Sequence, residues 1–205
     1  NKPDFAAPNG GNNTVLGNDD VSDADLYPNF YGTSAAAPHA AASAALLMQA
    51  RVKFYKPAEV TTTDFFKNTF TPNDVRTLLK NTATPVTTTV SGLPTAAAGA
   101  GAINAETAIK TFSNATPIIN DGGITVNDLP GGQVEVIVSG EYLNPNSTIY
   151  IGGVQQLGST VNSTLTEVTV TIPSLVGNPS FQLYSPPQAG TNGEDGGLSD
   201  PRYLS

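Results

Sequence analysis

The stretch Gly32-Thr33-Ser34-Ala35-Ala36-Ala37-Pro38-His39 opens a run of small residues that continues to Ala50. The residues from Ala35 to Met48 predict a helix, because alanine and leucine have high helix propensity. The only proline of this run falls within about one turn of the expected start, where no intrahelical N–H bond is lost. Almost every side chain in it is small or apolar, which predicts a helix buried on all sides.

Ser34 is the candidate nucleophile of the chain. It stands at the expected turn from loop to helix, where a hydroxyl is clear of its own backbone and the free N–H groups of the helix lie beside it. His39 follows five residues later and, at about 100° per residue, points about 140° away around the helix axis. His39 therefore cannot reach the Ser34 hydroxyl, and we expect it to be a packing residue of the helix.

Four motifs in the first half of the chain resemble the subtilisin-like serine proteases. The segment from Gly32 to His39 is similar to the G-T-S-x-A-x-P-H nucleophile motif of that family, and Lys2-Pro3-Asp4-Phe5-Ala6-Ala7-Pro8 resembles the strand before it. Residues 71–83 and 99–108 are similar to the segments that close the family's domain. The resemblance covers residues 1–112 and implies an α/β fold, in which this chain holds the C-terminal half of a parallel-sheet domain.

The resemblance implies a secreted or cell-surface serine endopeptidase in which Ser34 forms an acyl-enzyme with protein or peptide substrates. In the family the histidine base, its aspartate and the oxyanion asparagine all precede the segment that begins here at Lys2, and His39 is the only histidine of this chain. We therefore expect the chain to be inactive by itself and to be completed by an N-terminal part of the same protease, as a cleaved or separate chain. The alternative is a non-catalytic adhesion or binding protein that uses a degenerate protease fold as a scaffold.

Composition limits the other possibilities. The chain has 205 residues, of which 39% are hydrophobic and 13% charged, as in a globular protein. Seventeen acidic residues against nine basic ones argue against a nucleic-acid surface. Cysteine is absent, so disulfides are excluded, and no apolar run approaches the roughly 20 residues of a membrane span.

The charge is distributed unevenly along the chain. Residues 1–112 hold eight of the basic and nine of the acidic side chains, whereas residues 113–205 hold one and eight. This shift predicts a domain boundary, with the protease segment at 1–112 and a second domain at 115–205.

The rest of the protease segment is expected to be scaffold. Two further helices are predicted from their first residues. One begins with Thr71 as its N-cap and Pro72 at its first position, and the last begins with Asn104 as its cap and continues through Thr111. A short buried strand is expected at 4–7 and a second short strand at 99–103. The remaining segments are expected to be irregular, with a loop at 9–30, a surface connection at 51–70 and a loop or hairpin at 84–98.

Four carboxylates lie within seven residues of the expected loop, namely Asp19, Asp20, Asp23 and Asp25. Such a density could bind a hard cation such as calcium, but the glycine and closing glutamate of an EF-hand are missing. A solvated acidic loop is the favoured interpretation, with calcium as the minor one. No metal ligand is assigned from the sequence.

The second domain is predicted to be all-β. Four apolar or alternating runs are separated by clusters of Gly, Pro and Asn, which is typical of a β-sandwich; the runs are 134–140, 148–151, 168–172 and 181–184. The order of motifs over residues 115–187 resembles an IPT/TIG-type immunoglobulin-like domain. Tyr142, Tyr150 and Tyr184 could form a sugar-stacking face, but tyrosines of a sandwich are more often core or rim residues. The glycine-rich stretch 188–200 is expected to be a flexible tail, and Tyr203-Leu204 the start of a further strand.

Overall fold

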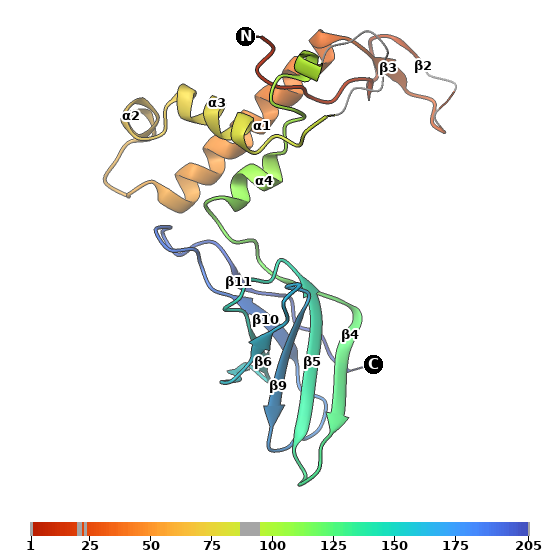
Figure 1. Cartoon of the computed structure of the whole chain (residues 1–205), viewed down its shortest axis with the longest axis vertical. Coiled ribbons are helices and arrows are strands. Elements are labelled where there is room, and N and C mark those ends of the chain that lie inside the picture. Colours follow the sequence, from red (N-terminus) through yellow and green to blue (C-terminus); the bar gives the residue numbers. More distant parts are fainter. Residues whose placement is uncertain (1, 20–21, 23, 87–94, 205) are drawn as a thin grey trace. The chain divides into compact units, whose positions relative to one another are not determined.

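The computed structural model describes residues 2–19, 22, 24–86 and 95–204. The chain divides into two compact units, Asn1–Thr111 and Phe112–Ser205, and each is described by itself. Figure 1 shows that α-helices dominate the first unit and strands the second.

Helix α1 (Thr33–Tyr55) is the longest element of the first unit as described. Its C-cap is Lys56, whose backbone is extended because the next residue is Pro57. The helix begins two residues earlier than predicted, so Pro38 lies inside it rather than in its first turn. Proline has no N–H to donate to the carbonyl of Ser34, four residues before it, so the prediction that no helical bond is lost is wrong.

The prediction that this helix is buried on all sides is also wrong for the described residues. Only Ala35, Leu47 and Ala50 of α1 are buried, and Leu46 is 50% exposed. The reason is that α1 packs against α3 (Pro72–Asn81) and α4 (Ala105–Lys110), which cover only part of its surface (Figure 1). A small, apolar face of α1 is therefore left open.

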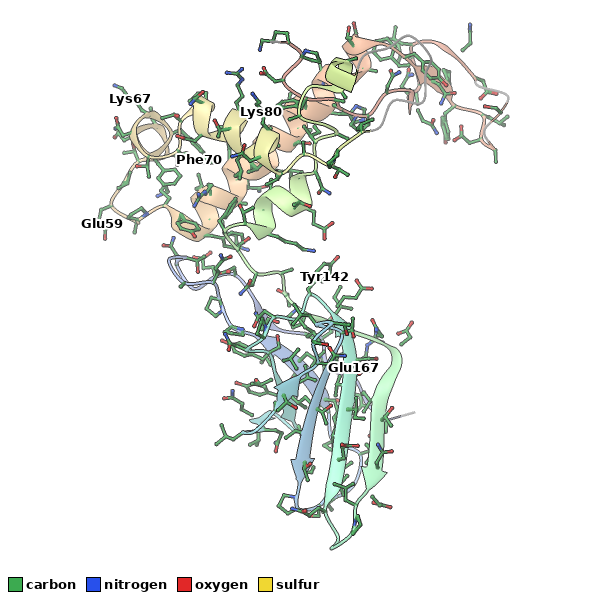
Figure 2. The ribbon with its side chains drawn as sticks, viewed as in Figure 1. Glu59, Lys67, Phe70, Lys80, Tyr142 and Glu167 are labelled. Carbon is green, nitrogen blue, oxygen red and sulfur yellow. The ribbon has the colours of Figure 1, made fainter. Side chains whose placement is uncertain are left out.

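The connection after α1 is more ordered than predicted, because it contains α2 (Thr62–Asn68). Thr61 caps this helix by accepting a hydrogen bond from the N–H of Asp64. Phe65 and Phe70 are buried, and the guanidinium of Arg51 in α1 lies 5.0 Å from the ring centre of Phe70. This cation–π contact joins the connection to α1. Figure 2 labels Phe70 beside α2.

The predicted caps of α3 and α4 are confirmed. Thr71 and Asp74 form a capping box at the start of α3, with Pro72 at its first position. The side chain of Asn104 accepts a hydrogen bond from the N–H of Thr107 in α4. Between these helices lies a short 3₁₀ helix, Thr95–Ala98, while residues 87–94 of the predicted loop or hairpin are outside the described residues.

Short antiparallel strands replace the loop predicted at 9–30. They are β1 (Gly11–Asn12), β2 (Asn18–Asp19) and β3 (Pro28–Phe30), in the order β1-β3-β2. The strands predicted at 4–7 and 99–103 are reduced to single bridges, Phe5 with Gly99 and Ala6 with Ala102, and residues 4–7 are half-buried rather than buried. The bridge of Ala6 is the one parallel pairing among the described residues, which form no parallel sheet.

The second unit consists of two antiparallel sheets (Figure 1). One sheet has the order β4-β5-β9-β8, and its strands are Ile118–Asp128, Val134–Glu141, Glu167–Ile172 and Thr160–Val161. The other has the order β11-β10-β6-β7, and its strands are Gly197–Leu198, Phe181–Ser185, Thr148–Ile151 and Val154–Gln155. The four predicted strands are confirmed as β5, β6, β9 and β10.

Strand β4 was not predicted, because Gly122 and Gly123 interrupt its apolar pattern. It pairs with β5 on both sides of a register shift between Ile119 and Ile124. A Cβ atom on Gly123 would lie 2.8 Å from the backbone oxygens of Asn120 and Ser139, so glycine is required at this irregularity.

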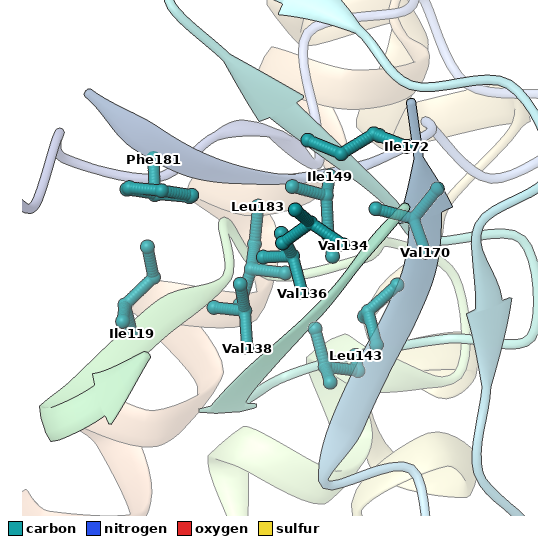
Figure 3. Close-up of a cluster of buried hydrophobic side chains, with 11 residues drawn as sticks. Ile119, Val134, Val136, Val138, Leu143, Ile149, Val170, Ile172, Phe181 and Leu183 are labelled. Atoms are coloured by element: carbon teal, nitrogen blue, oxygen red, sulfur yellow. The ribbon is translucent and has the colours of Figure 1, made fainter. Parts of the chain in front are cut away.

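Buried side chains from both sheets form one hydrophobic core (Figure 3). Val136 and Val138 of β5 meet Ile149 of β6 and Phe181 and Leu183 of β10, and all five are 0% exposed. Burial of each such side chain contributes about 1.5–3 kcal/mol. The alternating burial of β5 and β10 follows the period of two that predicted these strands.

The stretch 188–200, predicted as a loop and flexible tail, is a loop that leads into a short strand. This stretch contains β11, and Asp195 and Ser199 within it are buried. Polar contacts hold it, because the Ser199 hydroxyl accepts from the N–H of Leu183 and the Asp195 carboxylate accepts several hydrogen bonds. Tyr203-Leu204 starts no strand; a single bridge joins Arg202 to Phe181 instead.

Candidate functional site

Ser34 is the second residue of α1 and is exposed to solvent. The predicted position at the turn from loop to helix is therefore confirmed, while its catalytic role stays a prediction. No side chain caps the first turn of α1. Backbone N–H groups of a helix start have no partner within the helix, so those at Thr33 and Ser34 are available to an incoming oxygen atom.

Gly32 forms the turn that leads into Ser34. Its φ of 108° lies in the left-handed region that favours glycine. Its carbonyl accepts hydrogen bonds from the N–H groups of Ala35 and Ala36, at 2.9 and 3.2 Å. Its own N–H donates to the side-chain oxygen of Asn9 at 2.7 Å. The Gly32 peptide thus links the first turn of α1 to a residue 23 positions earlier.

Asn9 belongs to a segment that runs alongside β3. The N–H of Gly10 donates to the carbonyl of Phe30 at 3.1 Å, and Gly11 pairs with the same residue. Asn29 of β3, only 4% exposed, donates its side-chain N–H to the carbonyl of Gly10 and to Asn12 Oδ1. Sequence reasoning missed Asn9 and Asn29, although an asparagine followed by two glycines is a turn signal that could have directed attention to residues 9–11.

An open groove of about 570 Å³ begins beside this turn. Residues of small side chain line most of it; they are Pro3, Ala6, Ala7, Gly32, Thr33, Ala36, Ala37, Ala40 and Ala97, together with Phe5 and Asn9. The groove follows the first half of α1, next to the candidate nucleophile. It is therefore a surface on which another polypeptide segment can lie close to the backbone.

His39 does not act on Ser34. Its Nδ1 is 2.8 Å from the carbonyl oxygen of Ala35 in the preceding turn of the same helix. Its ring lies near Gly11, since a Cβ added there would be 3.5 Å from Cε1. The side chain is exposed on the surface of α1, where these two contacts hold its ring.

Asp4 is held by basic side chains. It accepts a hydrogen bond from Arg76 of α3 at 2.5 Å and another from Lys2. The hydrogen bonds from Arg76 and then from Lys2 lower the pKa of Asp4 well below its usual range. Asp4 is thus an ionised structural carboxylate that joins the segment before β1 to α3, and it is not a proton donor.

The acidic loop gives no support for a metal site among the described residues. Asp20 and Asp23 lie outside them. Asp25 accepts hydrogen bonds from the side chain of Asn12 and from the N–H of Tyr27, and Asp19 is exposed in β2. Within the described ranges no three His, Cys, Asp or Glu side chains are close enough together to hold a metal ion. Calcium stays a prediction.

Two of the three tyrosines considered for a sugar-stacking face lie next to each other in the sheet. Tyr150 and Tyr184 are half-buried neighbours on β6 and β10, with ring centres 5.8 Å apart. Tyr142 is at 36% exposure in the turn after β5, where its φ is 61°. This arrangement supports the interpretation of these residues as sheet packing and rim.

Chemically, the site as described holds an exposed hydroxyl and helix N–H groups, but no base for the hydroxyl. Residues 1–101 match the model of the subtilase family, Peptidase_S8. The match supports a subtilase-related protease portion and suggests an α/β class for this part of the chain. No curated protein matches the chain. Among the described helices, none is both long and apolar enough to cross a membrane.

Proposed function

We propose that the segment matching the subtilase family is the C-terminal portion of a serine endopeptidase, with Ser34 as its nucleophile. The observation that carries this proposal is the exposed position of Ser34 in the uncapped first turn of α1, inside the matched residues 1–101. Subtilases act on peptide bonds, so proteins or peptides are the proposed substrates.

The proposed reaction is acyl transfer to Ser34. Its Oγ attacks the carbonyl carbon of a peptide bond while a base takes the hydroxyl proton, and the same base then returns the proton to the leaving amine. Water hydrolyses the resulting ester and frees the enzyme. The N–H of Ser34 is placed to donate to the negative oxygen of the tetrahedral intermediate.

The base has to come from another segment. His39 is the only histidine of the chain, and it is hydrogen-bonded within its own helix, to Ala35. We propose that an N-terminal part of the same protease supplies the histidine, its aspartate and an oxyanion asparagine. The chain by itself is then inactive.

The open face of α1 is the proposed docking surface for that segment. Leu46 is half exposed, and the neighbouring exposed side chains of Ala42 and Ala45 are small enough to allow a close approach of backbone. Leu46→Ala should have little effect on the stability of the chain alone, where the side chain is not covered. In the completed protein it should weaken association with the N-terminal segment by about 1–2 kcal/mol. Equal effects in both samples would contradict this docking surface.

For the second unit we propose an immunoglobulin-like sandwich of the IPT/TIG type that accompanies a secreted or cell-surface protease. Its two antiparallel sheets and shared core support this assignment. Circular dichroism and a solved structure of residues 112–205 would test the fold, and fractionation of the source cells would test the location.

The test of the catalytic proposal is covalent labelling. A fluorophosphonate probe should modify Ser34 in the protein that contains both this chain and its upstream segment, as located by peptide mass spectrometry. Ser34→Ala should abolish the label. Ser43→Ala is the matched control, because Ser43 lies in the same helix and hydrogen-bonds only to the carbonyl of His39 in the described residues. An unlabelled but folded protein would refute catalysis and favour a non-catalytic scaffold.

A further inference from the structure

We infer that Asn9 is a positioning residue for Ser34, acting through the Gly32 turn. This inference rests on the proposed function, because it concerns the same nucleophile. The side-chain oxygen of Asn9 accepts from the N–H of Gly32, the residue just before α1, so Asn9 acts on Ser34 indirectly. Its role is to fix the direction in which the chain enters the helix.

The need for such a residue follows from the start of α1. Ser, Thr, Asp and Asn are preferred at the start of a helix because their side chains accept from the first turn, which is worth about 1 kcal/mol relative to alanine. Here the N-cap is Gly32, which has no side chain, and no acidic residue lies in the first turn. Glycine at a φ of 108° also has wide freedom to rotate. The hydrogen bond from Asn9 restricts that freedom from outside the helix.

Asn9 can do this because its own backbone is fixed. The next residue, Gly10, donates to Phe30 and accepts from the buried side chain of Asn29. The ring of Tyr31 covers Gly10 so closely that a Cβ there would lie 2.6 Å from Cε1. The segment that carries Asn9 is thus attached to the residues that immediately precede Gly32.

Ser34 follows Gly32 by two residues, so a rotation of the Gly32 peptide moves both the hydroxyl and the N–H beside it. Attack on a carbonyl requires the oxygen within a narrow range of distance and direction, and small displacements reduce the rate strongly. The contact between Asn9 and Gly32 is therefore expected to act on the rate of acylation more than on the binding of substrate.

The experiment uses the protein with its upstream segment and three variants. Asn9→Leu keeps the approximate volume but removes the oxygen acceptor; Asn9→Asp restores it. Asn18→Leu is the control, since it places the same side chain on β2 of the same small sheet. Fluorophosphonate labelling of Ser34 is measured as a first-order rate at saturating probe and as the half-saturating probe concentration. Hydrogen exchange of the peptide spanning residues 30–36 is measured in parallel.

We expect Asn9→Leu to lower the saturated labelling rate about five- to tenfold, as loss of one hydrogen bond predicts, with an unchanged half-saturating concentration. Exchange at Gly32 should accelerate by a similar factor. Asn9→Asp should recover most of both, and Asn18→Leu should change neither. If Asn9→Leu changes neither the rate nor the exchange while the wild type is labelled, the inference is overturned. An unlabelled wild type refutes the proposed function instead, and the exchange at Gly32 then decides whether Asn9 holds the turn.

Discussion

The carboxylate of Asp195 accepts a hydrogen bond of 2.7 Å from the backbone N–H of Asn114, 81 residues earlier in the sequence. The same carboxylate accepts from the N–H of Gln188 at 2.9 Å and from the hydroxyl of Thr191 at 2.6 Å. Asp195 is only 4% exposed. A single buried carboxylate therefore holds the loop before β11 against Asn114, near the first residues of the second unit.

Replacing Asp195 should destabilise the second unit. Asp195→Ala leaves the donors on Asn114 and Gln188 without an acceptor, and we expect a loss of about 2–4 kcal/mol in the free energy of unfolding. Asp195→Asn should destabilise less than Asp195→Ala, because its amide oxygen can still accept from Asn114 and Gln188 while its NH₂ group faces the Thr191 hydroxyl, which can accept. Urea denaturation followed by circular dichroism measures both. Glu194→Gln, at the exposed neighbouring position, should stay within about 0.5 kcal/mol of the wild type.

The stability of the second unit should also depend on pH through Asp195. Burial by itself would raise the pKa of this carboxyl, but the hydrogen bonds from Gln188, Thr191 and Asn114 outweigh it and lower the pKa. Because the pKa of Asp195 is lower in the folded state, its ionised form stabilises the fold. This stabilisation is fully present above the pKa of the unfolded state, about 4, and is lost as the pH falls through the pKa of the folded state. Unfolding free energies measured from pH 7 down to pH 2 should fall more steeply for the wild type than for Asp195→Ala. Parallel curves would contradict the assignment.

Phe181 should be among the most sensitive core positions of the second unit. Its side chain is 0% exposed between the two sheets, so Phe181→Ala leaves a cavity and should cost about 3–5 kcal/mol (Figure 3). Val154→Ala on β7 is the control, because Val154 is 63% exposed and its loss should be within about 0.5 kcal/mol. Thermal or urea unfolding would separate the two, and similar losses would show that the described core is wrong.

Replacement of threonine by alanine should change the stability of α3 differently at its capping box and in its middle. Thr71→Ala removes the side chain that accepts from the N–H of Asp74, and should destabilise the helix by about 1 kcal/mol. Thr77→Ala lies in the exposed middle of α3, where alanine has the higher helix propensity, and should be neutral or slightly stabilising. The measurement is the unfolding free energy of the protease segment in the completed protein. A larger loss for Thr77→Ala than for Thr71→Ala would contradict the capping role.

The local signals of this sequence predicted three of the four described α-helices and four strands of the second unit. Thr71 with Pro72, and Asn104, mark helix starts through contacts with residues three positions away, so the information is contained in a short window. The same is true of β5, whose alternating residues report which face is buried. Ser34 was found for the same reason, from the turn and the helix that follows it.

The features that were missed depend on residues far apart in the chain. The burial of α1 is set by what packs on it, and a run of alanines cannot report that only part of its surface is covered. The contact of Asn9 with Gly32 requires two irregular segments to lie side by side, without an alternating pattern to indicate it. Asp195 was missed because a stretch rich in glycine and acids is typical of linkers, and its burial becomes visible only with Asn114 in place.

The register shift in β4 has a consequence for the behaviour of this protein at high concentration. β4 is an outer strand of its sheet, and an outer strand of this length offers a template along which foreign strands can add and grow into aggregates. The irregularity at Gly122-Gly123 breaks that template into two shorter pieces and twists it. Because a Cβ atom at Gly123 would collide with the backbone oxygens of Asn120 and Ser139, the same glycine that is required for the local geometry also helps to keep the molecule from polymerising through its sheet edge.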